Sequence, residues 1–161
     1  YMDNSMIEAK AYGELFIPSD HGYGASVWSR PLDADLESEK SKKKKEFLAQ
    51  YMGASSLSTY KRIVDFMSEK AESLVGNDFW YLSIVGILPQ YQGQGLGPGL
   101  ITPVLKQTDA LGVHSYLETF TPRNMRFYNR LGYESAGSFE EPETGAEYWL
   151  MIREPNPEIS C

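Results

Sequence analysis

The residues best placed to do chemistry form a glycine-rich turn at 89–97. An apolar run at 84–88 ends at Pro89, and an amphipathic helical pattern begins after the glycines at positions 93, 95, 97 and 99. Glycine permits positive φ and lets a ligand approach the backbone closely. Backbone N–H groups without partners at a helix N-terminus attract anions. The turn therefore predicts a main-chain cradle for an anion such as a diphosphate, with a plain strand–turn–helix connection as the alternative.

Two familiar phosphate-binding patterns do not fit this turn. A P-loop carries Gly-Lys-Ser/Thr after its glycines, whereas this chain has Gly97-Pro98-Gly99 there. A Rossmann loop has the spacing Gly-x-Gly-x-x-Gly, which 93–97 does not match. The pattern that is present is Gln92-x-x-Gly95-x-Gly97. A nucleotide-binding domain of unrelated fold is thus the weaker alternative.

The elements that must position this turn are predicted from hydrophobic periodicity and turn residues. Helix 96–111 lies between two strands, which makes a β-α-β crossover and requires a parallel pair. The flanking hairpins require antiparallel pairs. We predict an α/β fold: one domain with a mixed, mostly antiparallel sheet around a central parallel crossover. Strands are expected at 11–17, 24–30, 79–87, 113–119, 133–139 and 146–153, and helices at 33–52, 57–74, 96–111 and 121–131.

Details of these elements give further expectations. The run 79–87 is apolar nearly throughout, which predicts helices on both faces of the sheet. Ser55 or Ser56 is expected to cap helix 57–74, and Gly112 and Gly132 are expected to end helices. The apolar stripe of helix 57–74 is interpreted as core rather than as a ligand surface. Its members are Leu57, Tyr60, Ile63, Val64, Met67, Ala71 and Leu74.

Composition excludes several classes of protein. The net charge of −7 argues against a nucleic-acid partner, because phosphate binding needs clustered cations. The lysines 42–45 are interpreted as a solvated helix face, with a targeting or partner-binding patch as the alternative. No apolar run reaches the ~18–20 residues of a membrane span. Cys161 is the only cysteine, which excludes a disulfide framework and favours a cytoplasmic location. His21 and His114 lack a third ligand, so no metal site is expected.

At this point the sequence resembles the GNAT N-acetyltransferase family. The resemblance rests on Gln92-x-x-Gly95-x-Gly97 after Val85-x-x-x-Pro89, and on the block 117–133. That block, together with Trp28, is similar to the puromycin N-acetyltransferase-like branch. The resemblance covers about 24–153. It implies a domain at 1–153 whose N-terminal strand and helices are apparently absent, so that the domain is N-terminally incomplete, followed by a flexible tail at 154–161.

The resemblance implies that coenzyme A binds at the turn as acetyl-CoA, the acyl donor. Backbone amides would hold its pyrophosphate, and the end of strand 79–87 would pair with the pantetheine arm. Asn124 would hydrogen-bond the same arm. The implied coenzyme-binding residues are Ile87, Leu88, Gln92, Gly93, Gln94, Gly95, Leu96, Gly97 and Asn124.

Two catalytic residues are implied. Tyr128 lies one turn after Asn124 and would protonate the leaving thiolate. Glu118, near the end of its strand, would accept a proton from the attacking amine or orient a cationic substrate. The alternatives are that Tyr128 is a core aromatic beside Phe127, and that Glu118 forms a structural salt bridge with a nearby arginine.

The expected function is acetyl transfer from acetyl-CoA to a small primary amine, such as a drug, toxin or metabolite, in a ternary complex. The alternatives are a coenzyme A-binding module without turnover and an N-acetyltransferase acting on proteins or peptides. The expected assembly is a monomer or homodimer, with no membrane partner.

Overall fold

The computed structural model describes residues 2–159. Its six strands form one sheet in the order β1-β2-β3-β4-β6-β5. Only β3 and β4 pair in parallel; every other neighbouring pair is antiparallel. The elements are α1 (Met2–Tyr12), β1 (Gly13–Phe16), β2 (Gly24–Ser29), α2 (Ala34–Tyr51), α3 (Ala54–Glu72), β3 (Trp80–Ile87), α4 (Pro98–Leu111), β4 (Ser115–Thr119), α5 (Pro122–Arg130), β5 (Glu134–Glu141) and β6 (Ala146–Arg153), with short 3-10 turns η1 (Pro89–Tyr91) and η2 (Pro157–Ile159).

The predicted fold class is confirmed. Each predicted strand and helix is present, and α4 supplies the crossover between the parallel strands β3 and β4. Asp33 caps α2 by accepting a hydrogen bond from the Leu36 N–H. Gly112 ends α4 with φ of 67°, and Gly132 follows α5 with φ of 95°. Turn chemistry therefore set these boundaries as the sequence indicated.

Two local predictions were wrong. A helix, α1, precedes the first hairpin, although none was expected there. Its buried side chains are Ser5, Ala9 and Tyr12, so its inner face is mostly small and polar and leaves no apolar stripe to read in the sequence. The cap of α3 is Gly53, which makes no side-chain cap hydrogen bond, so neither Ser55 nor Ser56 has the expected role.

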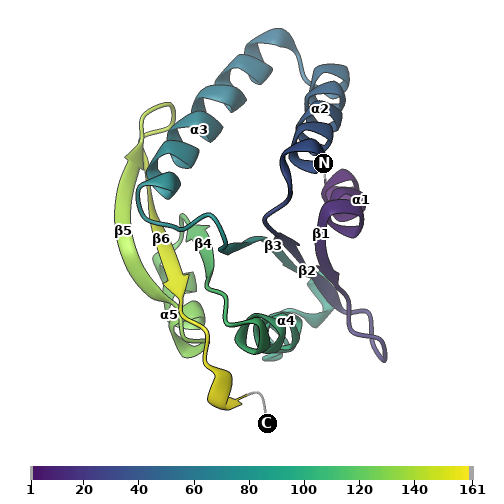
Figure 1. Ribbon diagram of the computed structural model, residues 1–161, viewed down its shortest axis with the longest axis vertical. Coiled ribbons are helices and arrows are strands. Elements are labelled where there is room, and N and C mark those ends of the chain that lie inside the picture. Colours follow the sequence, from purple (N-terminus) through teal and green to yellow (C-terminus); the bar gives the residue numbers. More distant parts are fainter. Residues whose placement is uncertain (1, 160–161) are drawn as a thin grey trace.

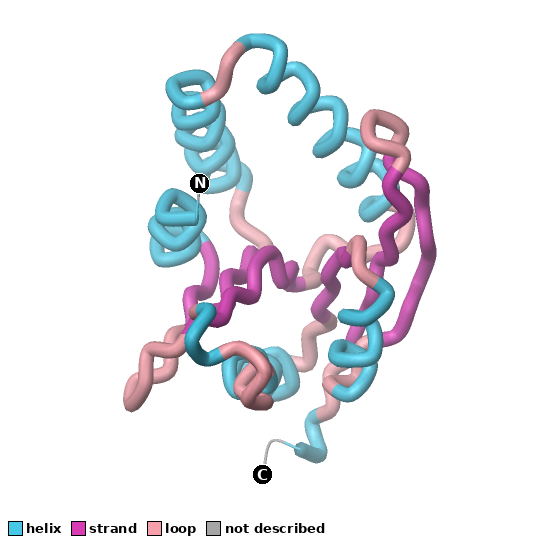
Figure 2. The backbone as a smooth tube through the Cα atoms, turned by 180° about the vertical axis from the view of Figure 1, so that it is seen from behind, coloured by secondary structure: helices cyan, strands magenta, loops and turns pink. Residues whose placement is uncertain are grey.

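The two faces of the sheet are covered differently. On one face α4 and α5 pack closely, and Leu100, Ile101 and Val104 of α4 are fully buried. Over the other face α2 and α3 rise away from the strands as an arch, seen from both sides in Figures 1 and 2. Helices therefore lie over both faces of the sheet, as predicted, but α2 and α3 do not pack closely against their face.

The arch changes the fate of the apolar stripe on α3. Ala71 is the only residue of α3 that is buried, and Val64 remains 38% exposed. The interpretation of this stripe as core is therefore wrong for most of its length. Because α3 leans away from the sheet, the stripe borders a cavity.

The C-terminal strand is tied to α4 by a buried ion pair. Arg153 on β6 donates to both carboxylate oxygens of Asp109, at 2.6 and 3.0 Å. The Asn156 backbone N–H donates to Asp109 as well, at 2.8 Å. The first residues after β6 are therefore also bound to α4. Residues 160–161, the end of the expected tail, lie outside the described residues. Within the described part of the chain, no helix is both long and apolar enough to cross a membrane.

Candidate functional site

The glycine turn joins β3 to α4 through two left-handed glycines. Gly93 and Gly95 have φ of 74° and 73°, and a Cβ on either would point into open space. The side chain of Tyr23, from the β1–β2 hairpin, braces the turn by donating to the Leu96 carbonyl at 3.1 Å. The sequence had not indicated this brace, because it joins residues 73 positions apart.

Most N–H groups of this turn are unengaged. Gln92 donates its backbone N–H to the Pro89 carbonyl at 3.3 Å. Among the described residues, no acceptor is found for the N–H groups of Gly93, Gln94, Gly95, Leu96 and Gly97. Gly93, Gln94 and Gly95 are also solvent-exposed. The turn thus presents a run of exposed donors next to a helix N-terminus, which is favourable for an anion.

Strand β3 loses its neighbour on one side just before this turn. It pairs with β4 at Trp80 and Tyr81, and the described ladder between them ends there. From Leu82 to Ile87, β3 remains paired with β2 alone. The two parallel strands therefore separate toward their carboxyl ends and leave one edge of β3 free.

The last residues of that edge are partly used by the protein itself. The Ile87 carbonyl accepts from Gln92 Nε2 at 2.9 Å. The Leu88 N–H donates to the Tyr23 carbonyl, and the Leu88 carbonyl accepts from Tyr91. Backbone groups alternate sides along a strand, so Val85 and Ile87 direct theirs to the edge away from β2, while those of Leu88 are engaged internally.

Helix α5 stands beside the turn. A Cβ on Gly97 would lie 2.9 Å from the Phe127 ring, so glycine lets the turn contact α5 closely without a shift of that ring. Tyr128 follows in the chain, and its ring packs edge-on against Phe127 and Tyr133 at centroid distances of 5.1 and 6.0 Å. Burial raises the pKa of Tyr128. Asn124 is exposed on the same helix.

A cavity of about 690 Å³ opens on the opposite face, beneath the arch of α2 and α3. Side chains alternate along β4, so Tyr116 and Glu118 border this cavity while Ser115, Leu117 and Thr119 are buried toward α4 and α5. Tyr128 is not among the lining residues. The structure thus places the two predicted catalytic residues on different faces of the sheet.

Glu118 is held in an unusual environment for a carboxylate. Its Oε2 atom is buried without a hydrogen-bond partner among the described residues. Burial raises the pKa of Glu118, and a hydrogen bond with Tyr81 opposes that rise. The predicted alternative, a salt bridge to Arg123 or Arg126, is not present among the described ion pairs. A buried polar atom left unpaired calls for an explanation, and a proton-accepting or cation-binding role supplies one.

Sequence reasoning missed the aromatic part of this cavity. Tyr81 on β3 and Tyr116 on β4 are register partners, and their rings stack at a centroid distance of 4.8 Å. Burial and the nearby charge of Glu118 raise the pKa of Tyr116 to about 12. The two-residue spacing of Tyr116 and Glu118 on β4 can be read from the sequence. The contact with Tyr81 cannot, because it depends on the register between β4 and its parallel neighbour β3.

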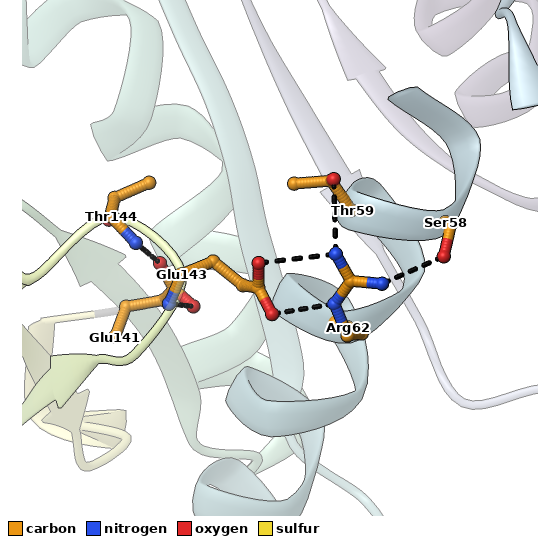
Figure 3. A network of polar contacts seen from close by, with 6 residues as sticks. All are labelled: Ser58, Thr59, Arg62, Glu141, Glu143 and Thr144. Carbon is orange, nitrogen blue, oxygen red and sulfur yellow. Dashed lines mark hydrogen bonds and ion pairs between the residues drawn. The ribbon is translucent and has the colours of Figure 1, made fainter. Parts of the chain in front are cut away.

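The arch is anchored at α3 by a network shown in Figure 3. Arg62 on α3 donates through Nε and Nη2 to the Glu143 carboxylate, at 2.6 and 3.3 Å, in the β5–β6 loop. Buried Glu141 holds that loop by accepting from the N–H groups of Glu143 and Thr144. Ser58 and Thr59 also accept from Arg62. Helix α3, which forms one wall of the cavity, is therefore connected to the β5–β6 hairpin.

Comparison with known proteins identifies the family to which this fold and site belong. Residues 46–133, more than half of the chain, match the family described as acetyltransferase (GNAT). The chain belongs to the GNAT acetyltransferase family. The matched range includes the glycine turn, the free edge of β3, Glu118 and Tyr128.

Solved structures with a similar fold include three acetyltransferases. Arylalkylamine N-acetyltransferase 2 from Aedes aegypti is 14% identical, with a TM-score of 0.65 over 96% of this chain and 79% of that one. The polyamine N-acetyltransferase of Drosophila melanogaster is 15% identical, with a TM-score of 0.64 over 92% of this chain and 78% of that one. A histone acetyltransferase HPA2 and related acetyltransferase from Corynebacterium glutamicum is 19% identical, with a TM-score of 0.56 over 87% of this chain.

Because the sequence identities are low, these likenesses establish the fold alone. The chain spans 62% of the length of the Corynebacterium glutamicum structure.

Proposed function

We propose that this protein transfers an acetyl group from acetyl-CoA to a primary amine by direct attack in a ternary complex. The carrying observation is the gap between β3 and β4, which has unengaged main-chain donors at its mouth and an unpaired buried carboxylate on the far face. Family membership gives the class of reaction, and the arrangement of these groups supports the roles proposed below.

The turn fits coenzyme A through its main chain. The five unengaged N–H groups at 93–97 would hold the pyrophosphate, since aligned amides at a helix N-terminus favour an anion. The free edge of β3, at Val85 and the Ile87 N–H, would pair with the pantetheine amides, as a ligand adds to an open strand. Asn124 is exposed beside that path and would bind the same arm. Acetyl-CoA supplies the thioester that is cleaved.

The two ionisable residues act from the two sides of the gap. Glu118 takes one proton from the bound ammonium group, which frees the nitrogen lone pair to form a bond to the acetyl carbon, and the second proton that the nitrogen loses passes to solvent water. Tyr128 donates a proton to the sulfur as the carbon–sulfur bond breaks. The phenol is protonated at neutral pH, and burial raises its pKa further, so the hydroxyl holds its proton until the thiolate forms. No metal takes part in these steps.

The acceptor would occupy the cavity beneath the arch. A volume of about 690 Å³ lies within the range of small-molecule sites. Two structural neighbours are named for an arylalkylamine and for polyamines, and the resemblance to the puromycin N-acetyltransferase-like branch also points to small amines. We propose a cytoplasmic enzyme acting on such an amine as a monomer or homodimer.

Release of free thiol tests the proposal. The purified protein is incubated with acetyl-CoA and a panel of primary amines, including a peptide with a free N-terminus, and compared with protein-free controls. Thiol release that depends on a small amine supports the proposal. Coenzyme binding by calorimetry without thiol release for any amine would instead indicate a binding module, and release with the peptide alone would indicate a protein acetyltransferase.

A further inference from the structure

The side of the cavity formed by α3 is mainly apolar and aromatic. The stripe on α3 contributes Tyr60, Ile63, Val64, Met67 and Ala71 to the lining. These side chains would be expected to pack against one another in a core, yet four of the five are only half-buried or exposed. Apolar surface left facing a cavity is stabilised when an apolar ligand covers it.

The floor of the same cavity combines an aromatic pair with one carboxylate. Tyr81 and Tyr116 stack at 4.8 Å, and Glu118 lies two residues after Tyr116 on the same face of β4. Glu118 Oε2 has no described hydrogen-bond partner. An ammonium group would pair with this oxygen and would also be attracted by the faces of the neighbouring aromatic rings.

The other charges of the lining do not favour a second ammonium group. Besides Glu118, the lining carboxylates are Glu8 and Glu37, and the lining cations are Arg30, Lys40 and Lys44. Glu8 lies 3.9 Å from Lys44 in an ion pair. Arg30 is paired with Glu14 at 3.8 Å, which leaves Glu37 and Lys40 as the other charges of the lining. Apart from Glu118, the lining therefore carries no excess of negative charge to attract the further ammonium groups of a polyamine.

From these three observations we infer that the acceptor is a monoamine with an aromatic or branched apolar body. Its ammonium group binds at Glu118, its first ring or branch rests against Tyr81 and Tyr116, and the stripe on α3 covers the remainder. This inference rests on the proposed function, since it assigns the substrate class of the proposed acceptor site. It selects between the two kinds of amine for which the structural neighbours are named.

The test compares 2-phenylethylamine with spermidine at saturating acetyl-CoA, by thiol release. We expect kcat/KM to favour 2-phenylethylamine by at least tenfold. Val64→Glu adds a carboxylate to the stripe at a position exposed enough to tolerate it, and we expect it to reduce that preference at least tenfold. Ser55→Glu is the matched control, because it adds the same charge to an exposed position of α3 outside the cavity lining.

A binding measurement separates this inference from the proposed function. Calorimetry with 2-phenylethylamine alone should show binding that Val64→Glu weakens at least tenfold and Ser55→Glu leaves unchanged. If no amine releases thiol but this pattern holds, the substrate class stands and the proposed turnover fails. Preference for spermidine, or equal 2-phenylethylamine binding by the wild type and Val64→Glu, would overturn the inference.

Discussion

At the residue scale, the site joins two groups whose environments differ. Glu118 borders the cavity with one buried, unpaired oxygen, whereas Tyr128 lies among rings on the other face of the sheet. Burial raises the pKa of both. For the carboxyl group, a raised pKa makes a stronger base, which suits a proton acceptor. For the phenol, a raised pKa makes a weaker acid, so the proposed role of Tyr128 depends on its position rather than on its acidity.

Tyr128→Phe tests the acid. Without the hydroxyl the leaving thiolate has no positioned proton donor, so we expect kcat to fall about 10²–10⁴-fold. The ring contacts with Phe127 and Tyr133 remain, so the affinity for coenzyme A should change little. Steady-state kinetics and calorimetry check both values. An unchanged kcat would mean that Tyr128 only fills space.

Glu118→Gln tests the base through pH. The acidic limb of kcat/KM should lie above the ordinary range of a glutamate, because burial raises the pKa of Glu118, and the variant should lose this limb. A carboxyl group with a raised pKa in the folded state stabilises the fold less as pH rises through that pKa.

The same substitution therefore has a stability readout. We expect Glu118→Gln to melt above the wild type at pH 8, with the difference disappearing near pH 4. Thermal unfolding at both values checks this. A variant less stable than the wild type at pH 8 would contradict the picture of an uncompensated buried carboxylate.

At the scale of elements, the glycine turn depends on backbone conformation. Gly95→Val places a β-branched residue at φ of 73°, which costs about 1–3 kcal/mol of strain and should change the turn. We expect coenzyme affinity to fall at least tenfold in calorimetry.

Gly112→Val is the control for that substitution, since Gly112 has φ of 67° and equally open space at its Cβ, but lies at the other end of α4. Both variants should lose stability, and only Gly95→Val should lose coenzyme binding. Equal coenzyme A affinities in the two variants would show that the turn does not bind the pyrophosphate.

The arch is the second element whose placement can be tested. Arg62→Gln removes the ion pair that connects α3 to the β5–β6 loop, so the stripe should cover the acceptor less well. We expect KM for the amine to rise about three- to tenfold, because losing part of an apolar contact has effects of this size, with coenzyme affinity unchanged. Lys61→Gln, exposed on the same helix, is the control. An unaltered KM in Arg62→Gln would show that α3 is held by its ends alone.

At the scale of the whole molecule, the Asp109–Arg153 pair holds the C-terminal strand to the crossover helix. Burial raises the pKa of Asp109, but the hydrogen bonds and charge of Arg153 and the Asn156 N–H outweigh it and hold the pKa below its usual value. Such a group stabilises the fold above its unfolded pKa, and the contribution is lost as pH falls through the folded value.

Asp109→Asn should therefore destabilise the protein by about 3–5 kcal/mol at pH 7, since it leaves a buried arginine without its countercharge. The deficit should shrink as pH falls below about 4, the ordinary pKa of an aspartate, and should be lost as pH passes through the lower pKa of folded Asp109. Urea unfolding at pH 7 and at about pH 3 checks this, with exposed Asp20→Asn as the control. A loss below 1 kcal/mol at pH 7 would contradict the assigned role.

The sequence by itself determined the features that depend on local chemistry. Glycine spacing at 93–97 specified a turn with positive φ, period-2 and helical patterns specified the crossover, and Gly112 specified the end of α4, because each is set by neighbours within a few residues. The family resemblance rested on the same local motifs.

Only the tertiary structure decided what faces what. The stripe on α3 has one pattern whether it packs in a core or borders a cavity, and the lean of the arch selected the cavity. The separation of β3 from β4, the Tyr81–Tyr116 stack and the unpaired Glu118 oxygen likewise arise from segments distant in sequence. Hydrophobic periodicity records that a face is apolar; which partner covers it depends on long-range packing.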